Sequence, residues 1–195
     1  MLRGWICSIR HQGNLSCTRQ SRRRICGSTQ DSIDHQRLGT IIGEAMKTAY
    51  GYLATGHDNP GRSSGGRSLS IWTHYMTDSN YNDAFTPARC SCPPTPALTV
   101  GAGLQGIEVQ AKAAAHNKTV VTGATGSVGF LGLFGGGGHG PTSSEYGLAS
   151  DQVLEIQVVS AAGEILTANE CQNSDLFYAL RGVSAPPRRT VVSSD

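Results

Sequence analysis

The chain has 195 residues, enough for one ordinary domain and a fraction of a second. Hydrophobic residues make up 38% of it and aromatic residues 6%, so a core is expected, although a sparse one. The net charge of +2 does not favour nucleic-acid binding, the arginine-rich stretch at 19–24 is expected to be a solvated tail, and no stretch approaches the ~18 apolar residues of a membrane helix.

The cysteines suggest neither a metal site nor a definite compartment. None of the six forms a CxxC pair, so no zinc site is expected: Cys7, Cys17, Cys26, Cys90, Cys92 and Cys171. Disulfides among the first three are conceivable, but the spacing fixes no pairing. The N-terminus lacks the apolar run of a signal peptide, and the glycosylation sequons at Asn14 and Asn117 matter only in a secreted chain. The compartment therefore stays open.

The first half of the chain shows little regular patterning. Residues 1–40 have neither helical nor strand periodicity and are predicted to be irregular or disordered. Residues 41–54 have apolar positions near helical spacing, which predicts a helix leading into a short strand. A Gly/Asn/Pro/Ser-rich loop follows at 55–66, and the alternation at 68–76 predicts a strand. The prolines of 86–96 indicate a connector.

The second half is more regular. Strands are predicted within 97–103 and 118–123, with a helix at 104–117 between them, because its apolar residues fall on one helical face. The stretch 147–168 contains two strand-like runs separated by the tight turn "AAGE", and 173–182 begins with a cap signal and predicts a short helix. Mixed elements in this order predict an α+β domain with nucleotide-binding loops between them.

Two glycine-rich loops stand out, "TGHDNPGRSSGG" at 55–66 and "TGATGSVGFLGLFGGGGHG" at 122–140. Without Cβ atoms, backbone can approach a phosphate closely, and successive N–H groups can converge on its oxygens. Each loop follows a strand-like run. The pair therefore suggests a cofactor with an extended pyrophosphate, held from both sides.

The second loop also invites a nicotinamide-cofactor interpretation. Gly123, Gly126 and Gly129 have nearly the spacing of a short-chain dehydrogenase fingerprint. That motif should open a long helix, followed by a strand that ends in an acidic residue. Here four consecutive glycines and a proline follow, and the first acidic residue is Glu145 in a polar turn. A NAD(P)-dependent reductase is therefore kept only as the alternative.

Several segments together resemble a known family. "TGHDNPGRSSG", "ALTVGAG", the stretch from "VTGATGSVG" to "GEILTA", and "NSDLFYALRG" are similar to the FAD-binding half of FAD-linked oxidases of the vanillyl-alcohol-oxidase and berberine-bridge-enzyme type. The resemblance covers about residues 55–182 and is greatest to the fungal secondary-metabolite branch, which includes chanoclavine synthases. It implies a partial FAD-binding domain over 41–182, no C-terminal substrate domain, and a divergent tail at 183–195.

For the first loop, the resemblance implies contacts to FAD and one candidate for covalent attachment. The histidine of this loop often carries the flavin in that family, which makes His57 the candidate; such a bond would raise the redox potential of the flavin. The residues that match the loop are Gly56, His57, Asp58, Gly61, Arg62, Ser63 and Ser64.

For the second loop, the resemblance places Thr125 where members with two covalent bonds carry a cysteine, so a cysteinyl bond is excluded if the alignment holds. Gly136, Gly137 and Gly138 correspond to a turn beneath the flavin, and the strand around Val158 to the adenine end. Tyr146, Gly147 and Asp151 match the family as well, but for Tyr146 a packing role and for Asp151 a turn cap are equally open. The remaining matched residues are Gly123, Gly126, Ser127 and Gly129.

The implied activity is that of an FAD-dependent oxidoreductase in secondary metabolism, with alkaloid biosynthesis as the suggested setting. In the family, a small-molecule substrate transfers a hydride to the flavin, and molecular oxygen usually takes the electrons. No catalytic base can be assigned, because it lies in the substrate domain. After Gly182 the pattern departs from the family, so we expect a truncated copy or a gene-model error, with weak or no FAD binding and impaired or no activity. A non-catalytic remnant is the other alternative.

Overall fold

The computed structural model describes residues 5–9, 15–19, 24–25, 51–54, 68–74, 76–160, 162–182 and 189–193. The chain divides into two compact units. The first comprises Met1–Met76 together with Val159–Ile165, and the second comprises Thr77–Val158 together with Leu166–Asp195.

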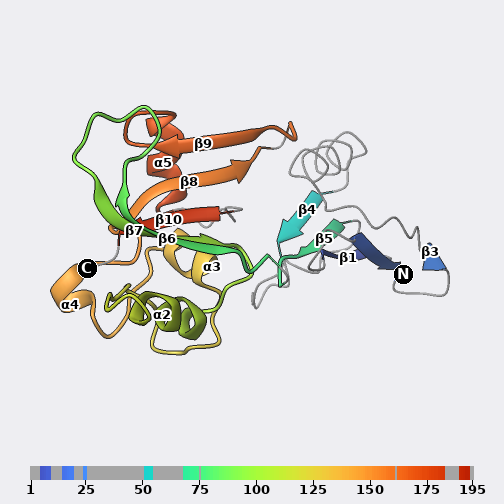
Figure 1. Cartoon of the computed structure of the whole chain (residues 1–195). Coiled ribbons are helices and arrows are strands. Elements are labelled where there is room, and N and C mark those ends of the chain that lie inside the picture. Colours follow the sequence, from blue (N-terminus) through green and yellow to red (C-terminus); the bar gives the residue numbers. More distant parts are fainter. Residues whose placement is uncertain are drawn as a thin grey trace. The chain divides into compact units, whose positions relative to one another are not determined.

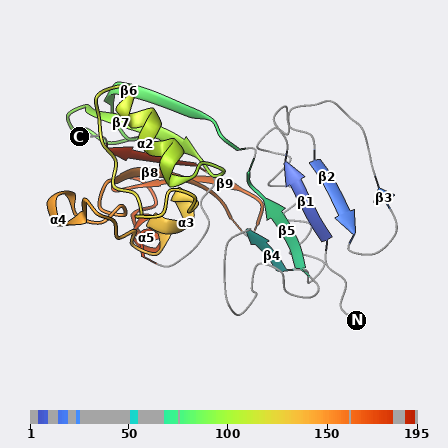
Figure 2. The same ribbon diagram turned by 90° about the horizontal axis from the view of Figure 1, so that it is seen from below.

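The first unit contains a five-stranded sheet in the order β3-β2-β1-β5-β4 (Figure 2). Strand β1 is antiparallel to β2 and parallel to β5, and β5 is also parallel to β4. The predicted strands that precede and follow the 55–66 loop are confirmed as β4 and β5. The bounds are β1 (Trp5–Ile9), β2 (Leu15–Arg19), β3 (Arg24–Ile25), β4 (Gly51–Ala54) and β5 (Ser68–Trp72).

The prediction that residues 1–40 lack regular structure is wrong for the three strands described there. Trp5 pairs with Arg19 across the β1–β2 ladder and with Leu69 of β5 in the parallel ladder. The second partner lies more than sixty positions along the chain, so this strand is stabilised by a pairing that no local pattern reports. The helix predicted for the first part of 41–54 lies outside the described residues.

The second unit contains a five-stranded sheet in the order β6-β7-β10-β8-β9 (Figure 1). The last strand of the chain, β10, lies in the middle and pairs antiparallel with both β7 and β8. The predicted turn between β8 and β9 is confirmed, since Ser160 N donates to Glu164 O at 2.8 Å. The bounds are β6 (Ser79–Phe85), β7 (Thr95–Gly101), β8 (Val153–Val159), β9 (Ile165–Asn169) and β10 (Arg189–Ser193).

The position of β10 corrects the expected domain boundary. The segment 183–195 was expected to be a tail outside the domain, yet Arg189–Ser193 is a central strand of its sheet. The stretch "RTVVS" is rich in β-branched residues, which favour strands. Departure from a family sequence pattern therefore did not remove the strand-forming character of the segment.

Figures 1 and 2 show α2 and α3 on the same face of this sheet. The predicted helices at 104–117 and 173–182 are confirmed as α2 and α5. Helix α2 begins after Gln105, whose N–H donates to Glu108 Oε2 at 2.8 Å, and this bond satisfies a donor at the helix start. The helices are α2 (Gly106–Ala114), α3 (Phe130–Gly135), α4 (Ser143–Tyr146) and α5 (Ser174–Leu180).

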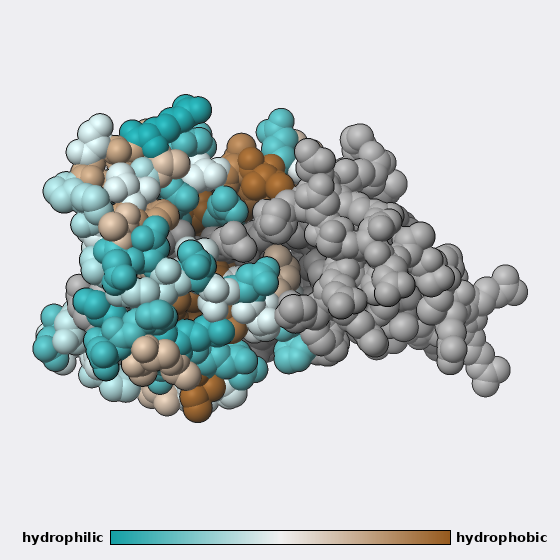
Figure 3. All heavy atoms as spheres, in the orientation of Figure 1, coloured by the Kyte–Doolittle hydropathy of each residue, from teal (hydrophilic) through white to brown (hydrophobic). Residues whose placement is uncertain are grey.

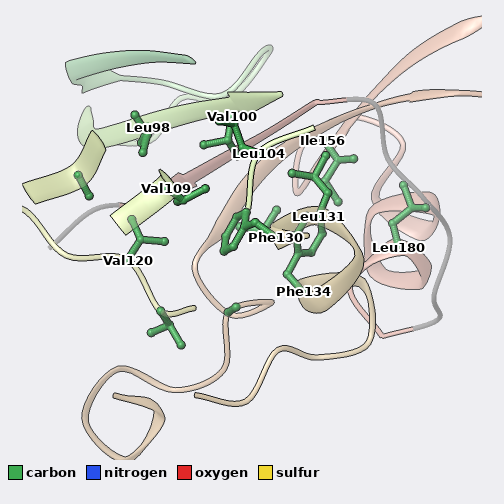
Figure 4. Close-up of a cluster of buried hydrophobic side chains, with 14 of the residues drawn as sticks. Leu98, Val100, Leu104, Val109, Val120, Phe130, Leu131, Phe134, Ile156 and Leu180 are labelled. Atoms are coloured by element: carbon green, nitrogen blue, oxygen red, sulfur yellow. The ribbon is translucent and has the colours of Figure 1, made fainter. Parts of the chain in front are cut away.

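One hydrophobic cluster joins the sheet to its helices (Figure 4). Phe130 and Phe134 of α3 are fully buried, with ring centroids 5.9 Å apart. Leu98 and Val100 of β7 and Ile156 of β8 supply the sheet side of the cluster. On the face of the molecule drawn in Figure 3, the described surface is mostly hydrophilic. The apolar side chains that a sparse composition provides are thus concentrated between α3 and the strands.

A buried polar network fixes the connector between β6 and β7. Asn169, which is fully buried, donates through Nδ2 to Ala88 O and to Glu155 Oε2, both at 3.0 Å. Glu155 Oε2 also accepts from Ala88 N at 2.8 Å. Asn169 Oδ1 accepts from the N–H of Cys171 at 2.9 Å. Buried polar groups are stabilising only when they are paired, and these are.

A disulfide between Cys90 and Cys171 connects the same two segments, with the Cα atoms 5.4 Å apart. The sequence did not predict this pair, because the two cysteines are 81 positions apart. The network and the disulfide together attach the proline-rich connector to the turn between β9 and α5.

Replacing both Cys90 and Cys171 by alanine is expected to lower the free energy of unfolding by about 2–4 kcal/mol, because a long loop of the unfolded chain is no longer closed. Guanidinium unfolding followed by circular dichroism measures the change. The control is Cys92→Ala, which removes an exposed free thiol and should leave stability unchanged. Equal midpoints for the double variant and the parent chain would contradict the prediction.

Val191→Pro is expected to destabilise the second unit by about 2–3 kcal/mol, since it removes a ladder donor from a strand paired on both sides. Val191→Thr keeps the N–H and the β-branched shape, and serves as the matched control. Urea unfolding of both variants provides the comparison. If the two variants are equally stable, β10 does not have the central position described.

Candidate functional site

The glycine-rich segment begins with residues that are buried but do not form a strand. Val120, Val121 and Thr122 are nearly inaccessible, and a strand was predicted over 118–123. Instead of entering a ladder, the N–H of Val121 donates to the side-chain Oε1 of Gln152 at 3.0 Å. The prediction was wrong because a side chain, rather than a neighbouring strand, satisfies the backbone here.

Residues 123–129 form a loop that is attached to the N-terminus of α2. The N–H of Gly106 donates to Val128 O, and the N–H of Ile107 donates to Gly126 O, each at 2.9 Å. These are among the first donors of α2, which have no partner within the helix. Because the loop carbonyls occupy them, this helix end positions the loop and is not itself available to an anion.

Five backbone N–H groups of the loop are free in the described part of the chain. Within the described part of the chain, no hydrogen bond is donated by the backbone N–H groups of Gly123, Ala124, Thr125, Gly126 and Ser127. The side chains of Thr125 and Ser127 are exposed. No charged side chain occurs between residues 119 and 144. The loop therefore offers several neutral donors to a phosphate or a carbonyl group, with no carboxylate nearby in sequence to repel it.

The glycines of the segment fall into two groups. Gly129 has nothing within 4 Å of the position of an added Cβ, so packing does not require a glycine there. By contrast, a Cβ on Gly138 would lie 2.5 Å from that of Ala149, and one on Gly140 would collide with the carbonyl oxygen of Thr122. Gly138 and Gly140 are needed for the close approach of backbone segments, whereas Gly129 leaves open space beside the loop.

Glycine also ends the helix that follows the loop. Helix α3 has six residues, and Gly137 and Gly138 come after it with φ of +102° and +77°. These backbone angles are disfavoured for other residues and stop the helix. Since no strand precedes the loop and only a short helix follows it, the segment lacks the two elements that the nicotinamide interpretation needs.

The residues predicted beyond the turn have structural partners. Asp151 Oδ2 accepts from Leu148 N at 2.8 Å, so Asp151 does cap a turn. Gly147 has φ of +79°, and an added Cβ would lie 2.9 Å from Asp151 Oδ2. Tyr146 is partly buried against the hydrophobic cluster, and Val158 belongs to it. These contacts account for the four residues without a ligand, and their predicted contacts to FAD stay predictions.

Gln152 is a site residue that the sequence reasoning missed. Its side chain is 6% exposed and holds the backbone of Val121 immediately before the loop. Its Nε2 is buried, with no acceptor among the described residues. The sequence signal that could have identified Gln152 is its place as a polar residue directly before the apolar strand β8. From such a position a side chain can bond to a backbone N–H that has no strand partner.

The other glycine-rich loop lies outside the described residues, and with it the predicted positions Gly56, His57, Asp58, Gly61, Arg62, Ser63 and Ser64. Gly136 is exposed, and Gly137 O accepts from Ser150 N at 3.0 Å. Of the residues that the structure describes, no group of three His, Cys, Asp or Glu side chains suits a metal ion, and no helix is long and apolar enough to cross a membrane.

The residues present fit a cofactor that carries phosphates. The free N–H groups of 123–127 and the exposed hydroxyls of Thr125 and Ser127 are neutral donors, and Gly129 leaves open space; these are the parts of which an uncharged phosphate cradle is made. Such a cradle binds phosphate oxygens through several weak donors rather than through one charged side chain. Gln152, whose Oε1 accepts from Val121 N just before the loop, also carries a buried Nε2 without an acceptor among the described residues.

Comparison with solved structures defines the class of protein. The fold is that of the VAO-type flavoproteins: MtVAO615 from Myceliophthora thermophila superimposes with a TM-score of 0.74 at 31% identity, over 83% of this chain and 30% of that protein. Residues 54–169 match the model of the FAD binding domain family, and the chain belongs to that family. FAD is the cofactor of this class.

Curated relatives are fungal proteins. Aurantioclavine synthase cnsA of Penicillium expansum is 47% identical over 130 residues, which are 66% of this chain and 28% of that protein. The FAD-linked oxidoreductase ffsJ of Aspergillus flavipes is 43% identical over 151 residues, 75% of this chain and 24% of the relative. The chain thus spans about a quarter of the length of each of these two relatives.

Two glycine variants test separately whether a glycine is needed for FAD binding or for packing of the fold. Gly129→Ala is expected to leave the unfolding midpoint unchanged and to weaken FAD binding, at least several-fold, because a methyl group would enter the open space beside the loop. Gly140→Ala is expected to destabilise the fold by several kcal/mol, on the order of the cost of overpacking a core. Flavin fluorescence titration and thermal unfolding measure the two effects.

The matched control is Gly182→Ala, at a position outside the loop where an added Cβ also meets nothing within 4 Å. Both stability and FAD affinity should equal those of the parent chain. If Gly129→Ala binds FAD as the control does, the loop does not approach the cofactor.

Proposed function

We propose that this chain is the FAD-binding part of an FAD-linked oxidoreductase that acts on a small molecule in fungal secondary metabolism, with alkaloid biosynthesis as the setting. The observation that carries the proposal is the uncharged loop 123–129, in which the N–H groups of residues 123–127 are free within the described part of a domain of this family. The names of its relatives, a synthase and an FAD-linked oxidoreductase, support the reaction class.

In this proposal the chain's own residues bind and orient the cofactor. The N–H groups of 123–127 and the hydroxyls of Thr125 and Ser127 donate to phosphate or flavin oxygens. The turn Gly136–Gly138 lies under the flavin, and its backbone is fixed by hydrogen bonds from Ala149 and Ser150. Gln152 is hydrogen-bonded to the backbone just before the loop, and the N-terminus of α2 to carbonyls within it. In this proposal these bonds position the loop donors before the cofactor binds.

Bound FAD supplies the redox chemistry, accepting two electrons and a proton equivalent as hydride from the substrate. Molecular oxygen is the proposed acceptor that returns the cofactor to its oxidised form. The uncharged character of the 119–144 segment is suited to this chemistry, because no carboxylate of the segment opposes the gain of negative charge during reduction.

Covalent attachment is proposed through His57 alone. The imidazole is a nucleophile that can bond to the flavin ring, whereas the hydroxyl of Thr125 cannot form the thioether that a cysteine at this position would provide. A single histidyl bond would raise the potential of the flavin and favour oxidation of the substrate.

The cofactor assignment is tested by adding FAD and, separately, NADPH to the full chain and measuring thermal unfolding. Because the chain is expected to bind FAD weakly, we expect FAD to raise the midpoint only at high concentration, as a ligand does that binds only the folded state, and NADPH to leave it unchanged. Protection by NADPH without protection by FAD would overturn the proposal. Bleaching of the flavin absorbance by a small-molecule substrate without oxygen, and its return on aeration, would then test the oxidase reaction.

His57→Ala is expected to abolish covalent flavin completely. After expression, the protein is precipitated with acid, run on a denaturing gel and viewed for flavin fluorescence. Only covalently bound flavin stays with the protein through these steps. The matched control is His74→Ala, a replacement of an exposed histidine outside both loops, which should keep the fluorescent band. A parent chain without the band would reject the covalent bond while leaving the FAD assignment to the unfolding test above.

A further inference from the structure

The turn after α2 carries a feature that cofactor binding does not use. Residues Asn117, Lys118 and Thr119 form the sequon Asn-Lys-Thr, the acceptor pattern for N-linked glycosylation. Asn117 and Thr119 are both exposed. A sequon can carry a glycan in a folded protein only at a place where the sugar extends into solvent, and this turn meets that condition.

The backbone of the turn does not need the Asn117 side chain. The N–H of Asn117 donates to Ala114 O at 3.0 Å, and the N–H of Lys118 donates to Ala113 O at 3.1 Å. With φ of +56° at Asn117, these two bonds form the Schellman arrangement that ends a helix. Asparagine tolerates this left-handed conformation better than most residues. Among the described residues, no hydrogen bond involves the side-chain amide of Asn117.

The same turn is held in place by its neighbour. The ring of His116 stacks on Tyr81 of β6, with centroids 3.9 Å apart and an interplanar angle of 14°. The end of α2 is thereby packed against the edge strand of the sheet, and Asn117 follows directly. The exposed side-chain amide of Asn117 therefore lies on a fixed turn. A sugar attached to it would displace no packed side chain.

The disulfide supplies an independent indication of where this chain folds. Cys90 and Cys171 are bonded, and structural disulfides form and persist in oxidising compartments. In eukaryotes, the compartment in which secreted proteins acquire disulfides is also the one in which Asn-X-Thr sequons receive glycans. The relatives of this chain are fungal, so both modifications would be available to it.

We propose that Asn117 is an N-glycosylation site and that the chain acquires its glycan and its Cys90–Cys171 disulfide in the same compartment. The donor is an oligosaccharide linked to a polyprenyl pyrophosphate. A bond forms between Asn117 Nδ2 and the anomeric carbon of the first sugar while the bond from that carbon to the pyrophosphate oxygen breaks. The lipid pyrophosphate is the leaving group, the amide gives up one proton, and no electrons are exchanged.

The test is cell-free translation of the full chain behind a secretory leader, in the presence of endoplasmic-reticulum microsomes. Asn14→Gln is included throughout, so that the other sequon makes no contribution. Chains that are protected from added protease have entered the microsomes, and these are treated with an endoglycosidase. We expect the protected Asn14→Gln chains to lose the mass of one core glycan on treatment.

Thr119→Ala is expected to abolish the mass change completely, while Thr119→Ser, which preserves the sequon, should retain it. Thr119 is exposed, so neither change disturbs the core, and Asn117 itself is unaltered in both. Protected Asn14→Gln chains without a mass change would overturn the proposal. An identical mass change in Thr119→Ala would overturn it equally, because the sugar would then be attached elsewhere.

Discussion

The pairing of β10 with both β7 and β8 is the interaction on which the described unit depends. Strands β7 and β8 are not neighbours, and only β10 lies between them. All residues of the candidate loop belong to the chain segment that leaves β7 and returns at β8. The two ends of that segment are therefore held at a fixed separation by a strand formed by residues 189–193, and α3 packs its phenylalanines against the sheet so completed.

The glycine-rich segment combines two demands that a sequence motif does not distinguish. At Gly138 and Gly140, backbone segments approach so closely that a methyl group would have no room. At Gly129, an added Cβ would meet nothing within 4 Å, so packing does not require a glycine. The same residue type is thus required by packing after α3 and not before it. Two carbonyls of the loop, those of Gly126 and Val128, accept from the first N–H groups of α2, and Gln152 accepts from Val121 just before the loop.

The connector between β6 and β7 illustrates how polar residues can organise a domain with a sparse core. Asn169 uses both ends of its amide, and Glu155 accepts two hydrogen bonds, so neither side chain is buried without partners. The disulfide adds a covalent constraint beside them. This disulfide and the exposed sequon at the end of α2 are the two observations on which the proposed maturation in an oxidising compartment rests.

Much of this protein could be predicted from local sequence. The helix at α2, the helix at α5 and the β8–β9 turn have short-range patterns that determine them. The two glycine-rich loops, together with the segments 97–103, 147–168 and 173–182, indicated the family and its cofactor. What only the tertiary structure decided are features whose partners lie far apart in the chain: the strands β1 and β10, the Cys90–Cys171 disulfide, and the absence of a strand at Val121. In each case the partner that stabilises the feature is a strand, a thiol or the amide of Gln152, and it is distant in the sequence. Folding brings it close, so the residue pattern of a short window does not predict it.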